Sequence, residues 1–153
     1  MGQTTKNSRD IKANAETIYR ALIDPTALEV WQAPGDMTTK IHNFDLRVGG
    51  GYQMSLFYPD SEKKMTGKTV GKEDRFTARF LELIPNKKIV QAINFETSNP
   101  DFMGEMIMEV TLNPFDKGTK VTFTFNNIPK GIRPSDNEAG TISSLEKLAH
   151  YVE

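Results

Sequence analysis

The stretch SDNEAGTISSLEKLAHYVE, residues 135–153, contains the features that decide the fold. Ser135 and Glu138 form an S-x-x-E capping box, a pattern in which two side chains satisfy backbone N–H groups at the start of a helix. Apolar residues then recur at helical spacing, at Ile142, Leu145, Leu148, Ala149 and Val152. The sequence therefore predicts a long amphipathic helix that runs almost to the last residue.

Residues 37–128 have the pattern of strands and turns. Apolar and polar residues alternate most clearly in two of the segments. We predict strands at 38–45, 51–58, 75–84, 88–96, 103–113 and 119–127. Short turns at 85–87 and 116–118 imply antiparallel neighbours. A long helix after such a run must bury its stripe on the sheet, and over a curved sheet it leaves space beneath for a small molecule.

The segment before these strands predicts a strand at 9–13 and two short helices. Asn14 is a good N-cap for a helix over 15–23, in which apolar side chains repeat at i,i+4 spacing. Asp24 then caps a second helix, which has Pro25 at its first position.

The remaining segments complete the predicted fold. Residues 1–8 are expected to be frayed, and the polar segment 59–74 is expected to be a mobile loop. The glycines at 49–51 stand before a strand and indicate a bulge or a sharp bend. The fold class is therefore α+β, a single domain over 1–153. A curved antiparallel sheet wraps around the C-terminal helix, with two short helices after the first strand.

Composition excludes several classes of function. The chain has 153 residues, a net charge of −1 and no cysteine, so we expect no disulfide and no thiol chemistry. Its apolar runs are too short to span a membrane, and its first residues lack a signal peptide. The balanced charge gives no electrostatic drive toward nucleic acid or anionic membrane. These features predict a cytoplasmic protein.

Five blocks in this sequence carry a resemblance to a known superfamily. They are 11–25 (IKANAETIYRALIDP), 45–50 (DLRVGG), 79–89 (RFLELIPNKKI), 118–122 (GTKVT) and 136–149, which opens on DNEAG and continues through SLEKLA. In this order the chain is similar to the START-like (SRPBCC) superfamily. It resembles the bacterial branch related to the C-terminal domain of the activator of the 90-kDa heat-shock chaperone ATPase.

The resemblance implies a helix-grip fold with a hydrophobic cavity between the sheet and the long helix. In this superfamily some members bind lipids or hydrophobic metabolites, some catalyse cyclisations, and one branch stimulates a chaperone. The position after Gly140 is often tryptophan in the family and is Thr141 here, which implies a larger cavity or a different entrance.

Catalytic and metal-binding motifs give little signal. The chain has no G-x-S-x-G elbow. The segment 67–73 has a glycine spacing one residue short of a phosphate loop, and Glu73 replaces the metal-binding Ser or Thr. His42 and His150 lack paired ligands at short spacing. We therefore predict no catalytic constellation, no metal site and no cofactor.

Glu82 is the carboxylate for which the sequence leaves two positions open, one in the cavity and one in solvent. Strict strand alternation puts it on the side of Ala78 and Phe80, so a cavity-facing Phe80 would bring Glu82 into the cavity. There it could act as a general acid or base, or orient a ligand. In the alternative, Leu81 and Leu83 point inward and Glu82 lies in solvent.

Aromatic and methionine side chains form the stronger signal, although simple core packing would explain the same pattern. The predicted cavity residues are Trp31, Tyr52, Met54, Phe80, Glu82, Phe95, Met106, Met108, Phe123, Phe125, Thr141 and Leu145. Tyr52, His42 or Glu82 could orient a ligand, and the segments 59–74 and 127–137 could gate its entry.

Three functions remain open at this point. The first is non-enzymatic binding of a small hydrophobic or amphipathic molecule. The second is a chaperone co-factor or protein-interaction module, and the third is a cyclase-like or hydrolytic enzyme that uses a cavity carboxylate. The sequence does not decide the ligand or the oligomeric state.

Overall fold

The structure, a computed structural model, describes residues 3–32, 37–57 and 73–153. The predicted order of elements is confirmed. It runs β1 (Gln3–Ile11), α1 (Ala15–Ile23), α2 (Pro25–Trp31), β2 (Thr38–His42), β3 (Gly51–Phe57), β4 (Glu73–Ile84), β5 (Lys88–Phe95), η2 (Pro100–Phe102), β6 (Met106–Phe115), β7 (Gly118–Ile128) and α3 (Pro134–Val152). The segment 59–74 falls largely outside the described residues, and its last two residues belong to β4.

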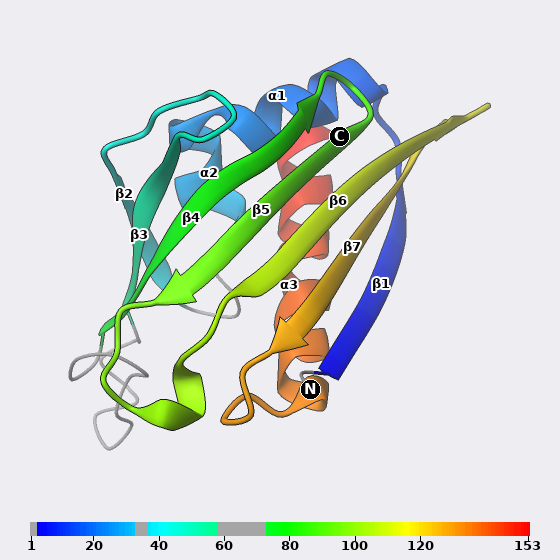
Figure 1. Cartoon of the computed structure of the whole chain (residues 1–153). Helices are drawn as coiled ribbons and strands as arrows, with labels where there is room; N and C mark the ends of the chain where they lie inside the picture. The colour runs from blue at the N-terminus through cyan, green and yellow to red at the C-terminus, as the bar shows by residue number, and fades with distance from the viewer. Residues whose placement is uncertain (1–2, 33–36, 58–72) are drawn as a thin grey trace.

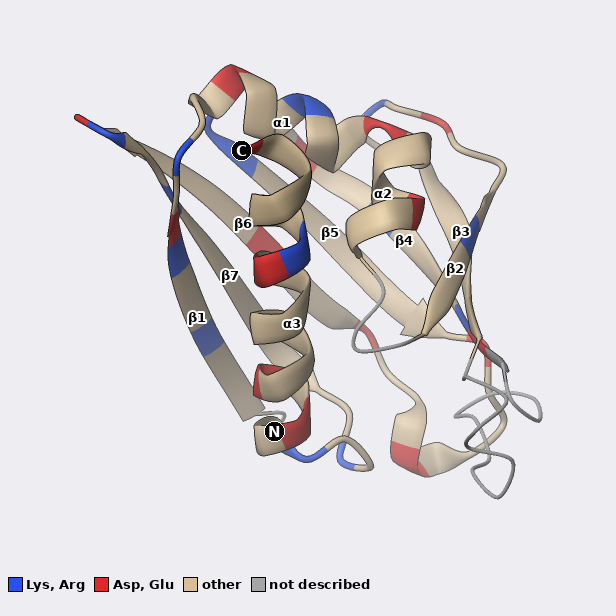
Figure 2. Cartoon of the chain, turned by 180° about the vertical axis from the view of Figure 1, so that it is seen from behind, with Lys and Arg blue, Asp and Glu red and all other residues tan. Residues whose placement is uncertain are grey.

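The seven strands form one sheet in the order β1-β7-β6-β5-β4-β3-β2 (Figure 1). Every pair of neighbours is antiparallel. Seen from the other side, α3 runs across one face of the sheet, with α1 and α2 beside it (Figure 2). This arrangement confirms the predicted α+β class and the curved sheet around a C-terminal helix. Among the described helices, none is long and apolar enough to cross a membrane.

The predicted turn at 85–87 and the predicted N-cap of α1 are also confirmed. The turn at 85–87 has Asn86 at a φ of 63°, and the Lys87 N–H donates to the Ile84 carbonyl oxygen at 3.0 Å. The Asn14 side chain accepts from the Thr17 N–H at 2.8 Å and so caps α1. Each of these contacts satisfies a backbone group that the ladder or helix leaves open.

The glycine run at 49–51 makes the predicted sharp bend. Gly49 has a φ of 90° and donates its N–H to the Phe80 carbonyl oxygen at 2.8 Å, which ties the bend to β4. A Cβ on Gly51 would lie 1.9 Å from the carbonyl oxygen of Ala78. Only glycine lets the two backbones approach this closely.

The first strand is longer than predicted. β1 begins at Gln3, and it pairs with β7 from the pair Gln3–Ile128 to the pair Ile11–Thr119. The prediction that residues 1–8 are frayed is therefore wrong for residues 3–8. β1 is an edge strand, and its backbone hydrogen bonds to β7 hold it in place. Its side chains are mostly exposed and polar, so the sequence of residues 3–8 shows no strand pattern.

The start of α3 also differs from the prediction. The helix begins at Pro134 with Arg133 as N-cap, so Ser135 lies inside the first turn and the predicted capping box is wrong. Proline suits this first position because its missing N–H would have no helical partner there. The Asp136 carboxylate accepts from the Arg133 guanidinium at 2.9 Å.

The buried face of α3 contains Leu145, Leu148 and Ala149 of the predicted apolar stripe, but it is rotated relative to the stripe in the first half of the helix. Ile142 is 54% exposed, so its predicted inward position is wrong. The buried residues of the helix are Thr141, Ser144, Leu145, Leu148 and Ala149. The Ser144 hydroxyl donates to the Gln32 carbonyl oxygen at 3.0 Å and ties α3 to the end of α2. Packing against both the sheet and α2 sets this rotation of the helix.

Candidate functional site

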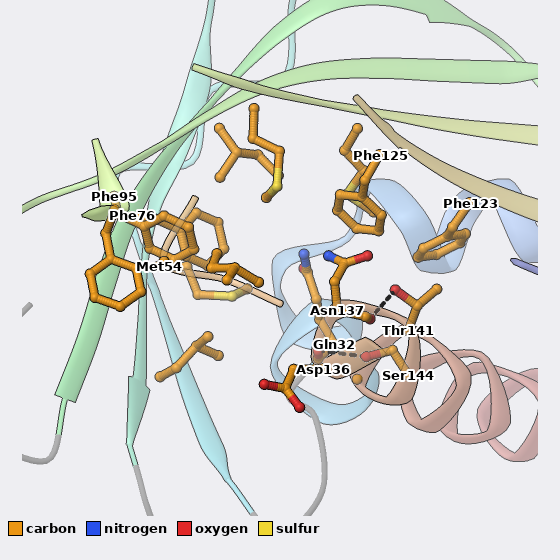
Figure 3. Close-up of a pocket in the computed structure, with 18 residues that line it drawn as sticks. Gln32, Met54, Phe76, Phe95, Phe123, Phe125, Asp136, Asn137, Thr141 and Ser144 are labelled. Carbon is orange, nitrogen blue, oxygen red and sulfur yellow. Dashed lines mark hydrogen bonds between the residues drawn. The ribbon is translucent and has the colours of Figure 1, made fainter. Parts of the chain in front are cut away.

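A cavity of ≈ 320 Å³ lies between the first half of α3 and the face of the sheet that it covers (Figure 3). Most of its wall is apolar and comes from five neighbouring strands, together with η2 and the segment before α3. The apolar side chains are Met54, Leu56, Phe76, Ile93, Phe95, Phe102, Met106, Met108, Phe123, Phe125 and Ile132. Such a wall favours an apolar ligand, because burial removes both surfaces from water.

Aromatic pairs give the wall a defined shape. Phe76 on β4 and Phe95 on β5 pack edge to face, with ring centroids 6.0 Å apart and planes at 69°. On the other side of the cavity, Phe123 meets the ring of Trp31 at 6.1 Å and 72°. Edge-to-face pairs restrain both rings, so the cavity is held open by side chains that support one another.

One end of the cavity is polar, and it is formed by α3 and the end of α2. Its residues are Gln32, Asp136, Asn137, Thr141 and Ser144. The Thr141 hydroxyl donates to the Asn137 carbonyl oxygen at 2.9 Å. The Asn137 side-chain oxygen accepts from the Thr5 hydroxyl on β1. Figure 3 shows the amide of Asn137 directed into the cavity, opposite the aromatic wall.

The structure places seven of the predicted cavity residues on the wall. They are Met54, Phe95, Met106, Met108, Phe123, Phe125 and Thr141. Their role in ligand binding stays a prediction. Strand alternation turns every second side chain of β6 and β7 toward α3. Because of this, both strands contribute several residues to the cavity wall.

Trp31 and Leu145 lie in the core and do not line the cavity. Trp31 is fully buried, and its indole N–H donates to the Ala21 carbonyl oxygen at 2.9 Å. Leu145 is buried on α3. Trp31 packs against the wall residue Phe123, but neither Trp31 nor Leu145 is on the wall, so the prediction that they line it is wrong for these residues.

Tyr52 and Phe80 belong to a separate aromatic cluster. Tyr52 stacks on Phe44 with ring centroids 5.5 Å apart, and Phe80 lies 5.9 Å from Tyr52. The Gln91 amide donates to the Tyr52 hydroxyl at 3.3 Å. Burial raises the pKa of Tyr52, against the opposing effect of hydrogen bonds from Gln91 and Gln32. The cluster is core, and neither ring lines the cavity.

Glu82 faces away from the cavity because of a β-bulge in β4. Phe80 pairs with Gln91 and Glu82 pairs with Val90, so Leu81 is an extra residue that shifts the alternation by one. The Glu82 carboxylate lies 3.5 Å from the Lys88 ammonium and its side chain is 43% exposed. The prediction that Glu82 reaches the cavity is therefore wrong.

Lys88 joins Glu82 to a second carboxylate on this outer surface. Its ammonium also pairs with Glu109 on β6 at 3.1 Å. The hydrogen bond and charge of Glu109, followed by the charge of Glu82, raise the pKa of Lys88. Salt bridges at this exposure contribute little to stability, so this group is a surface feature of the sheet.

His42 lies on the edge strand β2, away from the cavity. Its Nε2 is 3.3 Å from the Ser55 hydroxyl. Within the described residues, no cluster of His, Asp or Glu has the arrangement of a metal site. The ligand-orienting residues proposed from the sequence, His42, Tyr52 and Glu82, are thus all outside the cavity wall.

Apart from Thr141, the residues of the polar end were not predicted from the sequence, although they have a signal. Asn137, Gly140, Thr141 and Ser144 follow helical spacing and share one face of α3. This face is polar or small, and the neighbouring apolar stripe gives the stronger pattern in the sequence. Gln32 has no comparable signal, because it follows the last residue of α2.

The segment 127–137 contributes to the wall through Gly131 and Ile132 as well as the first turn of α3. The Gly131 N–H donates to the Asp101 carbonyl oxygen at 2.6 Å, which joins this segment to η2. A role in gating stays a prediction, and most of the other segment named as a gate, 59–74, lies outside the described residues.

An antiparallel sheet that holds a C-terminal helix over an apolar cavity defines the helix-grip, or START-like, class of proteins. The chain belongs to the family described as Activator of Hsp90 ATPase homolog 1-like protein, whose pattern matches residues 12–153. The resemblance seen in the sequence is therefore confirmed.

Solved structures agree with this assignment. A protein from Chromobacterium violaceum is 32% identical, with a TM-score of 0.85 over 99% of this chain and 98% of that chain. An AHSA1-like protein from Aeromonas hydrophila is 20% identical, with a TM-score of 0.73 over 98% of this chain and 92% of that chain. A protein from Arthrobacter aurescens shares the fold at 17% identity, with a TM-score of 0.80 over 97% of this chain and 85% of that chain. No curated protein matches the chain.

Proposed function

We propose that the protein binds a small hydrophobic or amphipathic molecule, without catalysis, in the cavity between the sheet and α3. The observation that carries this proposal is the cavity itself, ≈ 320 Å³ with an apolar wall and one polar end. Ligand sites combine these two features, because apolar burial supplies affinity and a few polar groups supply orientation.

The volume indicates the size of the ligand. An apolar cavity of about 150 Å³ is enough to hold benzene, and this cavity, at ≈ 320 Å³, is about twice as large. A molecule of two fused rings, on the order of 10 non-hydrogen atoms, suits it. Burial of roughly 200–250 Å² of ligand surface gives about 5–6 kcal/mol. A free energy of this size corresponds to a Kd of about 0.1 mM. Part of it is lost to association, so we expect a Kd on the order of 1 mM.

The test uses two tryptophan substitutions on successive residues of α3. Thr141 lines the cavity, whereas Ile142 is exposed. Thr141→Trp adds an indole inside the cavity, and Ile142→Trp adds the same group outside it. A panel of aromatic and aliphatic molecules is titrated against the wild type and both variants, by thermal denaturation and calorimetry.

A ligand at ten times its Kd should stabilise the wild type by about 1.4 kcal/mol, which raises Tm by about 3–6 °C. The proposal predicts that Ile142→Trp keeps this rise and Thr141→Trp loses it. If no member of the panel stabilises the wild type, or if both variants respond like the wild type, ligand binding in this cavity is wrong.

A second candidate function is that of a chaperone co-factor. Membership of a family described by an activator of a chaperone ATPase favours it. So do the exposed apolar side chains of Leu46 and Val48 between β2 and β3, which are 45% and 62% exposed. Exposed apolar groups close together suit a protein interface. This candidate predicts that the protein raises the ATPase rate of a bacterial 90-kDa chaperone, and that Leu46→Ser/Val48→Ser abolishes the effect without changing ligand binding.

A further inference from the structure

We infer that the cavity takes a neutral, hydroxyl-bearing aromatic molecule of about two fused rings, and that it rejects a carboxylate of the same size. This inference rests on the proposed binding function and specifies its ligand class. It follows from the charges at the cavity and from the hydrogen-bonding groups that its polar end leaves available.

The described residues that line the cavity include no cation that could pair with an anion. Among the described residues that line it, Asp136 is the one charged side chain, and it is negative. The nearest cation to this carboxylate, the Arg133 guanidinium, already forms bonds of 2.9 and 3.4 Å with it. A ligand carboxylate would therefore enter without a counter-charge, and an unpaired buried charge is strongly unfavourable.

The start of α3 does not compensate for this charge. Pro134 has no N–H, and the N–H groups of Asp136 and Asn137 both donate to the Arg133 carbonyl oxygen, at 3.0 and 3.1 Å. The backbone donors that make a helix start attract anions are thus largely occupied.

The two hydroxyl groups of the polar end act as acceptors toward the cavity. The Thr141 hydroxyl donates its hydrogen bond to the Asn137 carbonyl oxygen, and the Ser144 hydroxyl donates its hydrogen bond to the Gln32 carbonyl oxygen. Each hydroxyl oxygen keeps lone pairs that can accept a hydrogen bond. A ligand group that bonds to either hydroxyl oxygen must therefore donate the hydrogen bond.

Asn137 supplies the complementary donor. Its side-chain oxygen accepts from the Thr5 hydroxyl, which leaves the amide NH₂ for the cavity, where Figure 3 shows the side chain pointing. A hydroxyl group both donates and accepts, so it matches Asn137 together with Thr141 or Ser144. A carboxylate only accepts and leaves both hydroxyl oxygens without a donor.

The test uses three probes that share one skeleton: naphthalene, 2-naphthol and 2-naphthoate. At pH 7 a phenol is neutral and a carboxyl group is ionised. Affinities are measured by calorimetry for the wild type, Thr141→Val, Ser144→Ala and the double variant. Thr124→Val is the matched control, since Thr124 lies on the opposite side of β7 from Phe123 and Phe125, where it lines a separate pocket on the outer face of the sheet.

We expect 2-naphthoate to bind at least about tenfold more weakly than 2-naphthol. The double variant should weaken 2-naphthol about 2- to 10-fold, the value of one net hydrogen bond, and should leave naphthalene within about twofold. Thr124→Val should change neither.

Two results overturn the inference and leave the binding function standing: 2-naphthoate binding as tightly as 2-naphthol, or the double variant weakening naphthalene as much as 2-naphthol. Failure of all three probes to bind the wild type overturns both the inference and the binding function for ligands of this size.

Discussion

Thr141→Trp tests the cavity without requiring any knowledge of the ligand. Thr141 is 5% exposed and lines the cavity from α3. In a well-packed core such a large substitution forces neighbouring side chains and backbone to move. Next to a cavity of ≈ 320 Å³, the indole has a space to enter.

The expected change in stability follows from the areas involved. A buried tryptophan covers roughly 150–250 Å², and about 100–150 Å² of this exceeds what threonine covers. At about 25 cal/mol per Å², the added burial is worth about 2.5–4 kcal/mol. Strain from imperfect fit costs about 1–3 kcal/mol, and the loss of the Thr141 hydroxyl bond costs about 1 kcal/mol. The sum lies within about 2 kcal/mol of the wild type, on either side.

The assay is urea denaturation monitored by circular dichroism. An added tryptophan changes the fluorescence signal directly, whereas it leaves the circular dichroism of the backbone largely unaffected. Ile142→Trp controls for the effect of tryptophan on the helix, and its exposed position predicts a change within about 0.5 kcal/mol. If Thr141→Trp instead destabilises by more than about 3 kcal/mol while Ile142→Trp is neutral, the space beneath α3 is not available, and the reasoning about the cavity fails.

Three other substitutions test separate parts of the structure. Burial raises the pKa of Tyr52, so the unfolded chain loses the phenolic proton at a lower pH than the folded protein, and stability falls as pH rises above about 10. Tyr52→Phe should therefore flatten the decline of Tm between about pH 9 and 11. The same decline of Tm in the variant and the wild type would refute the raised pKa. Gly51→Ala places a Cβ 1.9 Å from the Ala78 carbonyl oxygen and should cost more than about 2 kcal/mol in urea denaturation, whereas a cost below about 1 kcal/mol would contradict the close approach. Glu82→Gln should leave ligand affinity unchanged, because Glu82 lies outside the cavity. It should change stability by no more than about 0.5 kcal/mol, because Lys88 keeps its ion pair with Glu109. A loss of ligand binding in this variant would show that Glu82 reaches the cavity after all.

The class of fold could be predicted because its signals are local. Alternation in β6 and β7, the short turns at 85–87 and 116–118, and the long final helix each follow from neighbouring residues. Together they leave few ways to bury one helix on one sheet. The cavity wall on β6 and β7 could be predicted for the same reason.

The position of Glu82 could not be predicted from alternation, because a single extra residue in β4 reverses it. The bulge at Leu81 forms where the Gly49–Gly51 bend meets the strand, with the Phe80 carbonyl oxygen accepting from Gly49. This contact joins segments far apart in the chain. A strictly periodic interpretation therefore assigns the wrong face to Glu82 and to the residues of β4 that follow it.

The polar end shows a different limit. Two stripes on α3 compete, and hydrophobicity alone selects the stripe that contains Ile142. The structure buries Thr141 and Ser144 instead and leaves Ile142 exposed. Placing polar residues on a buried helix face breaks the ordinary pattern, and such breaks are expected at functional sites.

The most direct test of the central claim is the NMR spectrum of the protein labelled with ¹³C at its methionine methyl groups, with and without 2-naphthol. Met54 lines the cavity from β3, and Met106 and Met108 line it from β6, whereas Met103 is 54% exposed. Binding in the cavity predicts saturable shifts of the first three methyl signals, caused by the aromatic ring of the ligand, with a much smaller change at Met103. No shift at the three cavity methionines, or a shift confined to Met103, would contradict ligand binding between the sheet and α3.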